Sequence, residues 1–146
     1  MHTKKITYSN LLEVRNLTES TYVIRLEKSD FEFKAGQYLV LNVPGEYKSR
    51  EYSIYSPEDA PYIDLLIKEV DEGEISKELK YLKIGTKVKI TGPFGFFILR
   101  DNEPAKNSHF TFVATGTGIA PFHSIILSNP GLDYEVIHGV DRKSVV

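Results

Sequence analysis

Residues 50–56 (REYSIYS) hold the side chains best suited to bind an anionic, aromatic ligand. Because side chains alternate along a strand, Arg50, Tyr52 and Ile54 would share one face. A guanidinium there suits phosphate oxygens, and the tyrosine ring can stack on a planar group. A strand with a surface arginine and a packed tyrosine has the same pattern, so this segment alone supports either interpretation.

Two glycine-containing segments could also receive phosphates. Residues 73–76 (GEIS) stand where a loop becomes a predicted helix, whose free N–H groups and dipole attract anions. A turn glycine at position 73 and a first-turn serine at position 76 without any binding role would give the same pattern, but Arg50 independently indicates a phosphate site. Residues 115–118 (TGTG) lie between a predicted strand and a predicted helix, the setting of a nucleotide loop. Pro121 stands where a full Gly-x-Gly-x-x-Gly motif has its last glycine.

Other chemistries find little support. The chain has no cysteine, which excludes a disulfide scaffold, a thiol nucleophile and a cysteine-ligated iron–sulfur cluster within it. His109, His123 and His138 fall on separate predicted elements, so no metal site is expected. The acidic residues among 69–74 favour a solvated loop beside a phosphate site over a hydrolytic acid–base pair.

Composition indicates a soluble globular protein, 41% hydrophobic and 26% charged. A net charge of −2 argues against binding to nucleic acid or to an anionic membrane surface. No apolar run approaches the roughly 18 residues that span a bilayer, and no signal peptide is evident. We therefore expect a cytoplasmic protein without membrane insertion.

The first hundred residues are predicted to be mainly β. Six closely spaced strand-like segments favour an antiparallel barrel, at 6–17, 21–26, 37–43, 51–56, 62–70 and 86–91. The last of them is expected to stop before Gly92-Pro93. One helix, 75–82, would place Ile75, Leu79 and Leu82 on one face and end at Gly85.

The character of the chain then changes. A polar stretch predicts a linker at 101–107, between a barrel domain, 1–100, and a second domain, 108–146. Strand 109–114, the glycine loop, helix 120–128 and strand 134–138 form a β–loop–α–β pattern typical of parallel α/β sheets. Only 39 residues follow Asn107, about one such unit, so we expect a domain truncated by design or proteolysis; a small appendage to the barrel is the alternative.

Four segments in order resemble the ferredoxin–NADP⁺ reductase superfamily, a family of FAD- and NAD(P)-binding oxidoreductases. They are residues 50–56, residues 67–76 (IKEVDEGEIS), residues 92–95 (GPFG) and residues 116–121 (GTGIAP). The resemblance spans about residues 5–140. It implies a mainly β fold: a six-stranded antiparallel Greek-key FAD-binding barrel with one helix. The first β-α-β part of a parallel α/β NAD(P)-binding domain, apparently incomplete, would follow.

The resemblance also assigns roles to residues. Arg50 would pair with the FAD pyrophosphate, Tyr52 would lie against the isoalloxazine ring, and Ser53 would direct its hydroxyl to flavin N5. Tyr52 and Ser53 are thus the candidate catalytic residues, and Thr117 would reach toward both flavin and nicotinamide. The cofactor-binding set comprises Arg50, Tyr52, Ser53, backbone groups of Ile67 and Lys68, Gly73, Ile75, Ser76, Gly116, Thr117, Gly118 and Pro121.

The implied activity is a flavin-dependent oxidoreductase of the ferredoxin or flavodoxin reductase type. Hydride would pass from NADH or NADPH to FAD, and electrons would pass on to a protein carrier or a redox partner subunit. The incomplete chain alone is expected to show little turnover. Two alternatives stay open: a flavin-binding electron-transfer subunit that requires a partner, and a nonenzymatic ligand-binding barrel that stays colourless after FAD is added.

Overall fold

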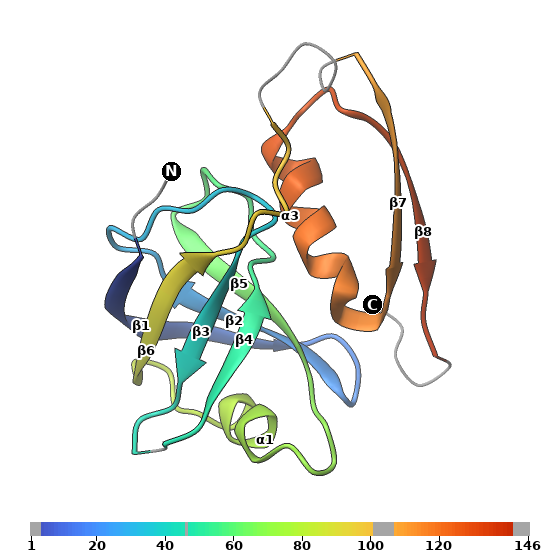
Figure 1. Ribbon diagram of the computed structural model, residues 1–146. Helices are drawn as coiled ribbons and strands as arrows, with labels where there is room; N and C mark the ends of the chain where they lie inside the picture. The colour runs from blue at the N-terminus through green and yellow to red at the C-terminus, as the bar shows by residue number, and fades with distance from the viewer. Residues whose placement is uncertain (1–3, 46, 101–106, 142–146) are drawn as a thin grey trace.

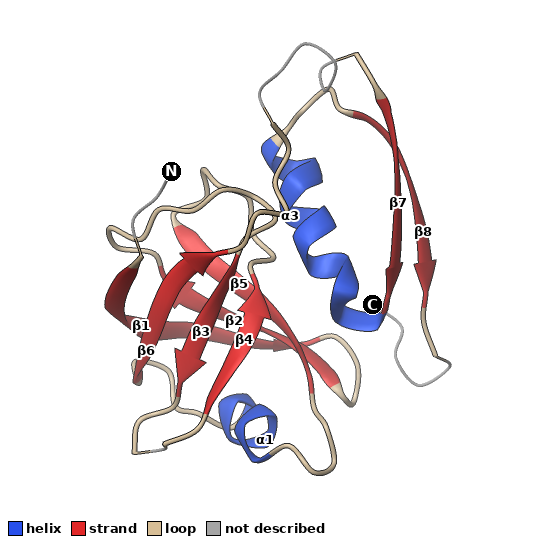
Figure 2. Ribbon diagram, viewed as in Figure 1, coloured by secondary structure: helices blue, strands red, loops and turns tan. Residues whose placement is uncertain are grey.

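The computed structural model describes residues 4–45, 47–100 and 107–141, which form two β-sheets and three helical segments (Figures 1 and 2). The larger sheet is antiparallel, with strand order β4-β3-β6-β1-β2-β5. Its strands are β1 (Lys5–Asn16), β2 (Thr21–Glu27), β3 (Tyr38–Asn42), β4 (Ser49–Ser53), β5 (Tyr62–Lys68) and β6 (Lys87–Phe94). A single bridge between Ile54 and Leu65 joins the two edges, so the sheet forms a nearly closed barrel, which confirms the predicted architecture.

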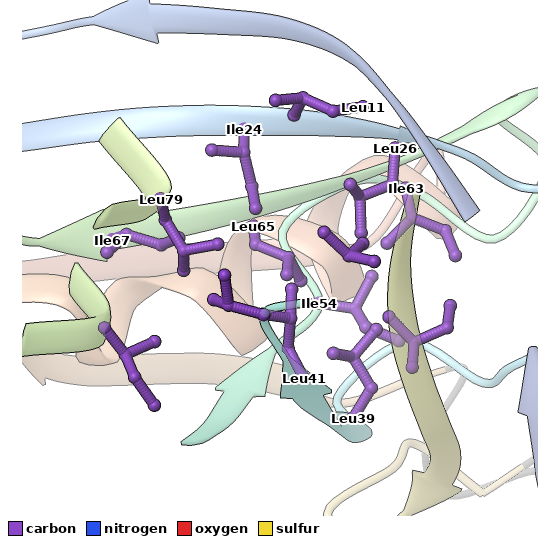
Figure 3. Packing of buried hydrophobic residues seen from close by; sticks show 14 of the residues in the cluster. Leu11, Ile24, Leu26, Leu39, Leu41, Ile54, Ile63, Leu65, Ile67 and Leu79 are labelled. Carbon is purple, nitrogen blue, oxygen red and sulfur yellow. The ribbon is translucent and has the colours of Figure 1, made fainter. Parts of the chain in front are cut away.

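The barrel is filled by the inward-facing side chains of alternating positions. Ile24 and Leu26 on β2 and Leu39 on β3 are fully buried (Figure 3). Ile63 and Ile67 on β5 point into the same core. Burying an aliphatic side chain of this size contributes about 1.5–3 kcal/mol, so this cluster is the main source of the barrel's stability.

Helix α1 (Glu74–Lys80) covers one end of the barrel (Figure 1). It inserts Ile75 and Leu79, four residues apart, into the core. The helix ends earlier than the predicted 75–82, at Lys80, and the N–H of Tyr81 donates to the Glu78 carbonyl. Gly85 does not end the helix, contrary to expectation, because it lies in the following turn and donates its N–H to the Leu11 carbonyl.

The ends of β4 and β6 differ most from the predicted strand boundaries. β4 ends at Ser53 because the chain then crosses toward β5: the Tyr55 N–H donates to the Asp64 carbonyl at 2.8 Å. β6 does not stop before Gly92 but continues through a cis Gly92-Pro93 peptide to Phe94. A register irregularity between β3 and β6 accommodates this extension, and Phe94 pairs with Tyr38.

The rest of the described chain forms a parallel β-α-β unit, as predicted. β7 (His109–Thr115) pairs in parallel with β8 (Asp133–Gly139). Between them lie a 3₁₀ turn, η1 (Gly116–Ile119), and helix α3 (Ala120–Ser128), which lies between the two strands and the barrel (Figures 1 and 2). Of the predicted linker 101–107, residues 101–106 lie outside the described residues. Among the described helices, none has the length and apolarity to cross a membrane.

Candidate functional site

The candidate site lies where the two edges of the barrel separate. β4 and β5 are the edge strands, and the Ile54–Leu65 bridge is their one point of pairing among the described residues. One backbone hydrogen bond flanks that bridge, from the Tyr55 N–H to the Asp64 carbonyl; beyond it, the described residues of β4 and β5 form no ladder with each other. We call the part flanked by residues 49–53 of β4 and residues 66–68 of β5 the β4–β5 opening.

Strand register decides which β5 residue faces the β4–β5 opening. The Asp64 carbonyl points toward the β4 side, and the Glu69 N–H donates in the opposite direction, to the Ser20 carbonyl on the β2 side. Because backbone groups alternate along a strand, those of Lys68 point toward the opening and those of Ile67 toward β2. The side chain of Ile67 is buried in the core, so Lys68 is the better candidate for backbone contact with a ligand.

Arg50 supplies a cation at the edge of the β4–β5 opening. Its Nη1 donates to the Ser49 carbonyl at 2.9 Å, and no carboxylate of the described residues forms an ion pair with it. Arg50 and Lys48 lower the pKa of Glu74, with the Lys48 hydrogen bond as the larger cause. Because Glu74 opens α1, the structure brings together the two segments that were predicted to bind phosphate.

Tyr52 and Ser53 differ in how far the protein uses their polar groups. Tyr52 packs against the barrel core, and burial raises its pKa to about 12, although Arg50 acts in the opposite direction. Its ring is therefore a neutral, largely apolar surface below that pH. The Ser53 hydroxyl has no hydrogen-bond partner in the described parts of the chain, so it is available to a ligand.

Hydrogen bonds to buried side chains fix the loop before α1. The buried Ser76 hydroxyl donates to the Gly73 carbonyl and accepts from the Val70 N–H, both at 3.1 Å. A Cβ on Gly73 would lie 2.9 Å from that Ser76 oxygen. The buried Tyr22 phenol also donates to the Ser76 carbonyl. Since the Ser76 hydroxyl is engaged and the Ile75 side chain is in the core, only backbone groups of this loop are free to meet a phosphate.

The glycine loop forms η1 and packs beside the β4–β5 opening. Ile119 and Ala120 contact Val23 and Leu66 of the barrel, which places the loop against β5. Gly116 adopts a left-handed φ of +53°. A Cβ at Gly116 or at Gly118 would meet no atom within 4 Å, so the loop faces open space that a nucleotide could enter. Pro121, in the first turn of α3, helps to fix where the helix begins.

Sequence reasoning missed the contacts that join α3 to the barrel. The Tyr55 ring stacks on the His123 ring with centroids 3.7 Å apart, and His123 Nδ1 lies 2.7 Å from the Tyr55 carbonyl oxygen. The buried Ser124 hydroxyl donates to the Ser56 carbonyl at 2.7 Å. The sequence offered only the positions of these residues as a sign of the contacts. Tyr55 and Ser56 end the segment 50–56, and His123 and Ser124 follow Pro121.

The described part of the chain offers no set of donor side chains for a metal centre. Across the described residues, no group of three or more His, Asp or Glu side chains is arranged to hold a metal ion. The polar groups available at the β4–β5 opening are instead a guanidinium, a hydroxyl and backbone edges, which suit a phosphate-bearing organic cofactor.

Comparison with known proteins agrees with this geometry. The chain is 37% identical over 124 residues to ferredoxin–NADP reductase B of Sorangium cellulosum, covering 81% of this chain and 50% of that protein. Cytochrome P450 reductase GcoB of Amycolatopsis superposes with a TM-score of 0.87 at 27% identity, over 99% of this chain and 46% of that one.

A ferredoxin NADP⁺ reductase of Neisseria gonorrhoeae, solved with bound FAD and NADP, superposes with a TM-score of 0.79 at 25% identity. The match covers 92% of this chain and 57% of that one. The chain spans half or less of the length of the first curated relatives it matches. Residues 10–98 match the family described as the oxidoreductase FAD-binding domain. The chain therefore belongs to this FAD-binding family, within the ferredoxin–NADP⁺ reductase superfamily.

Proposed function

We propose that this chain is the flavin-binding part of an oxidoreductase that uses NADH or NADPH and delivers electrons to a protein carrier or redox partner subunit. In this proposal residues 1–100 form the FAD-binding domain, 101–107 the linker and 108–146 the beginning of the NAD(P)-binding domain. Support comes from the family match and from the Neisseria reductase, which binds both nucleotides. The Sorangium relative, named for ferredoxin and NADP, supports a protein carrier as the acceptor.

The observation that carries the proposal is that Arg50 lies near enough to the start of α1 to affect the Glu74 carboxylate, at one edge of a barrel whose edge strands separate there. FAD needs a cation for its pyrophosphate, a surface for its ring and hydrogen bonds at its polar edge. Arg50 offers the cation in a planar fork, and the free backbone N–H groups beside Gly73 add donors. The fit rests on the charge and hydrogen-bonding capacity of these groups rather than on the size of a cavity.

Each remaining residue has a distinct task. Tyr52 shields one ring face from water, and Ser53 places a hydroxyl that can both donate and accept a hydrogen bond near flavin N5. The backbone of Lys68 bonds the flavin edge or its ribityl chain. Gly116, Thr117 and Gly118 let a nicotinamide nucleotide approach the opening from the α3 side. When bound, FAD supplies the hydride acceptor and the one-electron steps, and the protein supplies orientation and electrostatics.

A spectrum of the purified chain tests the proposal directly. After FAD is added and the excess is removed, absorption bands at about 370 and 450 nm should remain with the protein. Arg50→Gln should weaken FAD binding by about tenfold or more, the usual effect of removing a charge-assisted hydrogen bond. Arg15→Gln, an exposed β1 arginine, is the matched control and should bind like the unaltered chain. A chain that is folded by circular dichroism yet retains no FAD would refute the assignment.

A further inference from the structure

A second concave surface lies on the outer face of the barrel. It has a volume of about 420 Å³ and lies between β1, β3 and β6, with the turn after β3 at its rim. We call it the cationic groove and define it by Tyr8, Asn42, Pro44, Lys87 and Lys89. None of these residues belongs to the β4–β5 opening.

Strand register fixes the arrangement of the groove. Lys89 pairs with Tyr8 on one side and with Asn42 on the other, so the three side chains form a row across β1, β6 and β3. Lys87 lies two residues away on β6, and the intervening Val88 is buried. Both lysines therefore point outward from one face, about 6.6–6.8 Å apart along the strand.

Among the described residues, no ion pair accounts for Lys87 or Lys89. Other lysines of this protein are used in ion pairs, such as Lys5 with Asp30 and Lys80 with Glu69. Within residues 4–45, 47–100 and 107–141, neither Lys87 nor Lys89 pairs with a carboxylate, and no acidic side chain of these ranges lines the groove. Among the described residues, the groove thus combines two lysines that have no carboxylate partner with a Tyr8 side chain that is 66% exposed.

We infer that the cationic groove docks an extended acidic segment of a partner protein, with carboxylates at every second position. Side chains two residues apart in an extended chain repeat at about 6.8 Å, the spacing of Lys87 and Lys89. Tyr8 and Pro44 offer an aromatic and an apolar wall for the segment between its carboxylates. The groove has neither an arginine fork nor a helix N-terminus, which makes it a poor match for a phosphate ligand.

The groove lies on the outer face of the barrel and contains none of the residues proposed to hold FAD. It adjoins one end of the β4–β5 opening, because Asn42 pairs with Ser49, whereas Tyr38, the partner of Ser53, lies about 13 Å farther along β3. Docking at the groove therefore requires no cofactor. FAD retention and acidic-peptide binding can be measured on the same variants, so failure of one proposal is distinguishable from failure of the other.

The test uses the chain without added cofactor and a fluorescein-labelled peptide of alternating glutamate and serine. Fluorescence anisotropy should show saturable binding at about 10 mM salt that is largely lost at about 300 mM, where the Debye length is shorter. Lys87→Gln and Lys89→Gln should each weaken binding by about three- to fivefold. Lys83→Gln removes the same charge from an exposed position outside the groove and should leave binding unchanged.

Three results would overturn the inference. One is the absence of saturable binding to a folded chain. Another is equal weakening by Lys83→Gln and Lys89→Gln, which would show attraction to the overall field rather than to the groove. The third is displacement of the peptide by inorganic tripolyphosphate, where tripolyphosphate binds more tightly than the peptide and loses affinity in Lys89→Gln. That outcome would assign the groove to small anions instead.

Discussion

At the scale of single residues, Glu74 opposes the ligand that its neighbours would bind. Its carboxylate lies 2.6 Å from the Lys48 ammonium, and Lys48 and Arg50 lower its pKa, so it stays ionised at neutral pH. A phosphate held by Arg50 would meet this negative charge. We predict that Glu74→Gln tightens FAD binding by about two- to fivefold at low salt, which quenching of flavin fluorescence can measure. Glu78→Gln, elsewhere on α1, is the control, and weaker binding by Glu74→Gln would contradict the prediction.

The Tyr52 phenol gives the protein a distinctive response to alkaline pH. Burial raises its pKa from 10.0 to about 12, so folding favours the protonated form. The stabilisation is fully present below pH 10 and is lost as the pH rises through about 12. We predict that Tyr52→Phe removes one late tyrosinate step from an ultraviolet titration of the folded chain. Removal of an early step by Tyr52→Phe, with the late step unchanged, would disprove the burial effect.

At the scale of elements, one buried ion pair ties β2 to β5. Arg25 donates to both carboxylate oxygens of Asp64, at 2.8 and 2.9 Å, and its guanidinium lies 3.5 Å from the centroid of the Tyr62 ring. Asp64 is only 5% exposed, and removing its charge leaves the partly covered guanidinium with only the more distant Glu13 carboxylate, 3.8 Å away. We predict that Asp64→Asn lowers the free energy of unfolding by about 2–3 kcal/mol.

Urea denaturation measures this loss, and a second ion pair provides the control. Asp30 pairs with Lys5 in solvent, where an ion pair contributes little to stability. Asp30→Asn should therefore change stability far less than Asp64→Asn. Equal losses for the two variants would show that burial of the Arg25–Asp64 pair adds nothing.

The elements also show which features a sequence can predict. Alternating side chains are a local property, so the strands around Ile24 and Phe112 could be placed before any contact was known. The end of β4 could not, because it depends on a hydrogen bond from Tyr55 to a strand that follows later in the chain. The early end of α1 and the extension of β6 past Gly92 likewise depend on partners distant in sequence.

The candidate site divides in the same way. The shared face of Arg50 and Tyr52 follows from strand periodicity alone. The choice between Ile67 and Lys68 required the β2–β5 register, since a shift of one residue reverses which backbone groups face the opening. Ser76 was predicted to bind the cofactor, but only the fold shows that its hydroxyl is already hydrogen-bonded to the Gly73 carbonyl and the Val70 N–H.

At the scale of the whole molecule, α3 joins the barrel to the parallel strand pair. Its Phe122 ring contacts Phe112 of β7, with centroids 4.9 Å apart, and Phe97 after β6, at 5.5 Å. Ile125 packs with Ala35 of the barrel. Because these contacts and η1 lie along one side of the barrel, the position of the glycine loop relative to the β4–β5 opening depends on how firmly α3 is held.

Ser124 is the buried polar contact through which that attachment can be tested. Its hydroxyl is fully buried and donates to the Ser56 carbonyl. The Ser56 hydroxyl in turn accepts a hydrogen bond from the Asp64 N–H. Ser124→Ala would leave the Ser56 carbonyl without this donor, a loss of about 1–3 kcal/mol. The barrel core does not involve Ser124, so the loss should fall on α3 rather than on the strands.

We therefore predict faster amide hydrogen exchange in α3 of the Ser124→Ala variant, with unchanged protection in β2 and β5. Mass spectrometry of peptides covering residues 120–128 and 62–68 separates the two regions. Thr111→Val removes an exposed hydroxyl of β7 that bonds Glu135 and should leave both regions unaffected. Faster exchange throughout the barrel would mean that α3 and the barrel unfold as one unit, and no change in α3 would mean that the aromatic contacts alone hold the glycine loop in place.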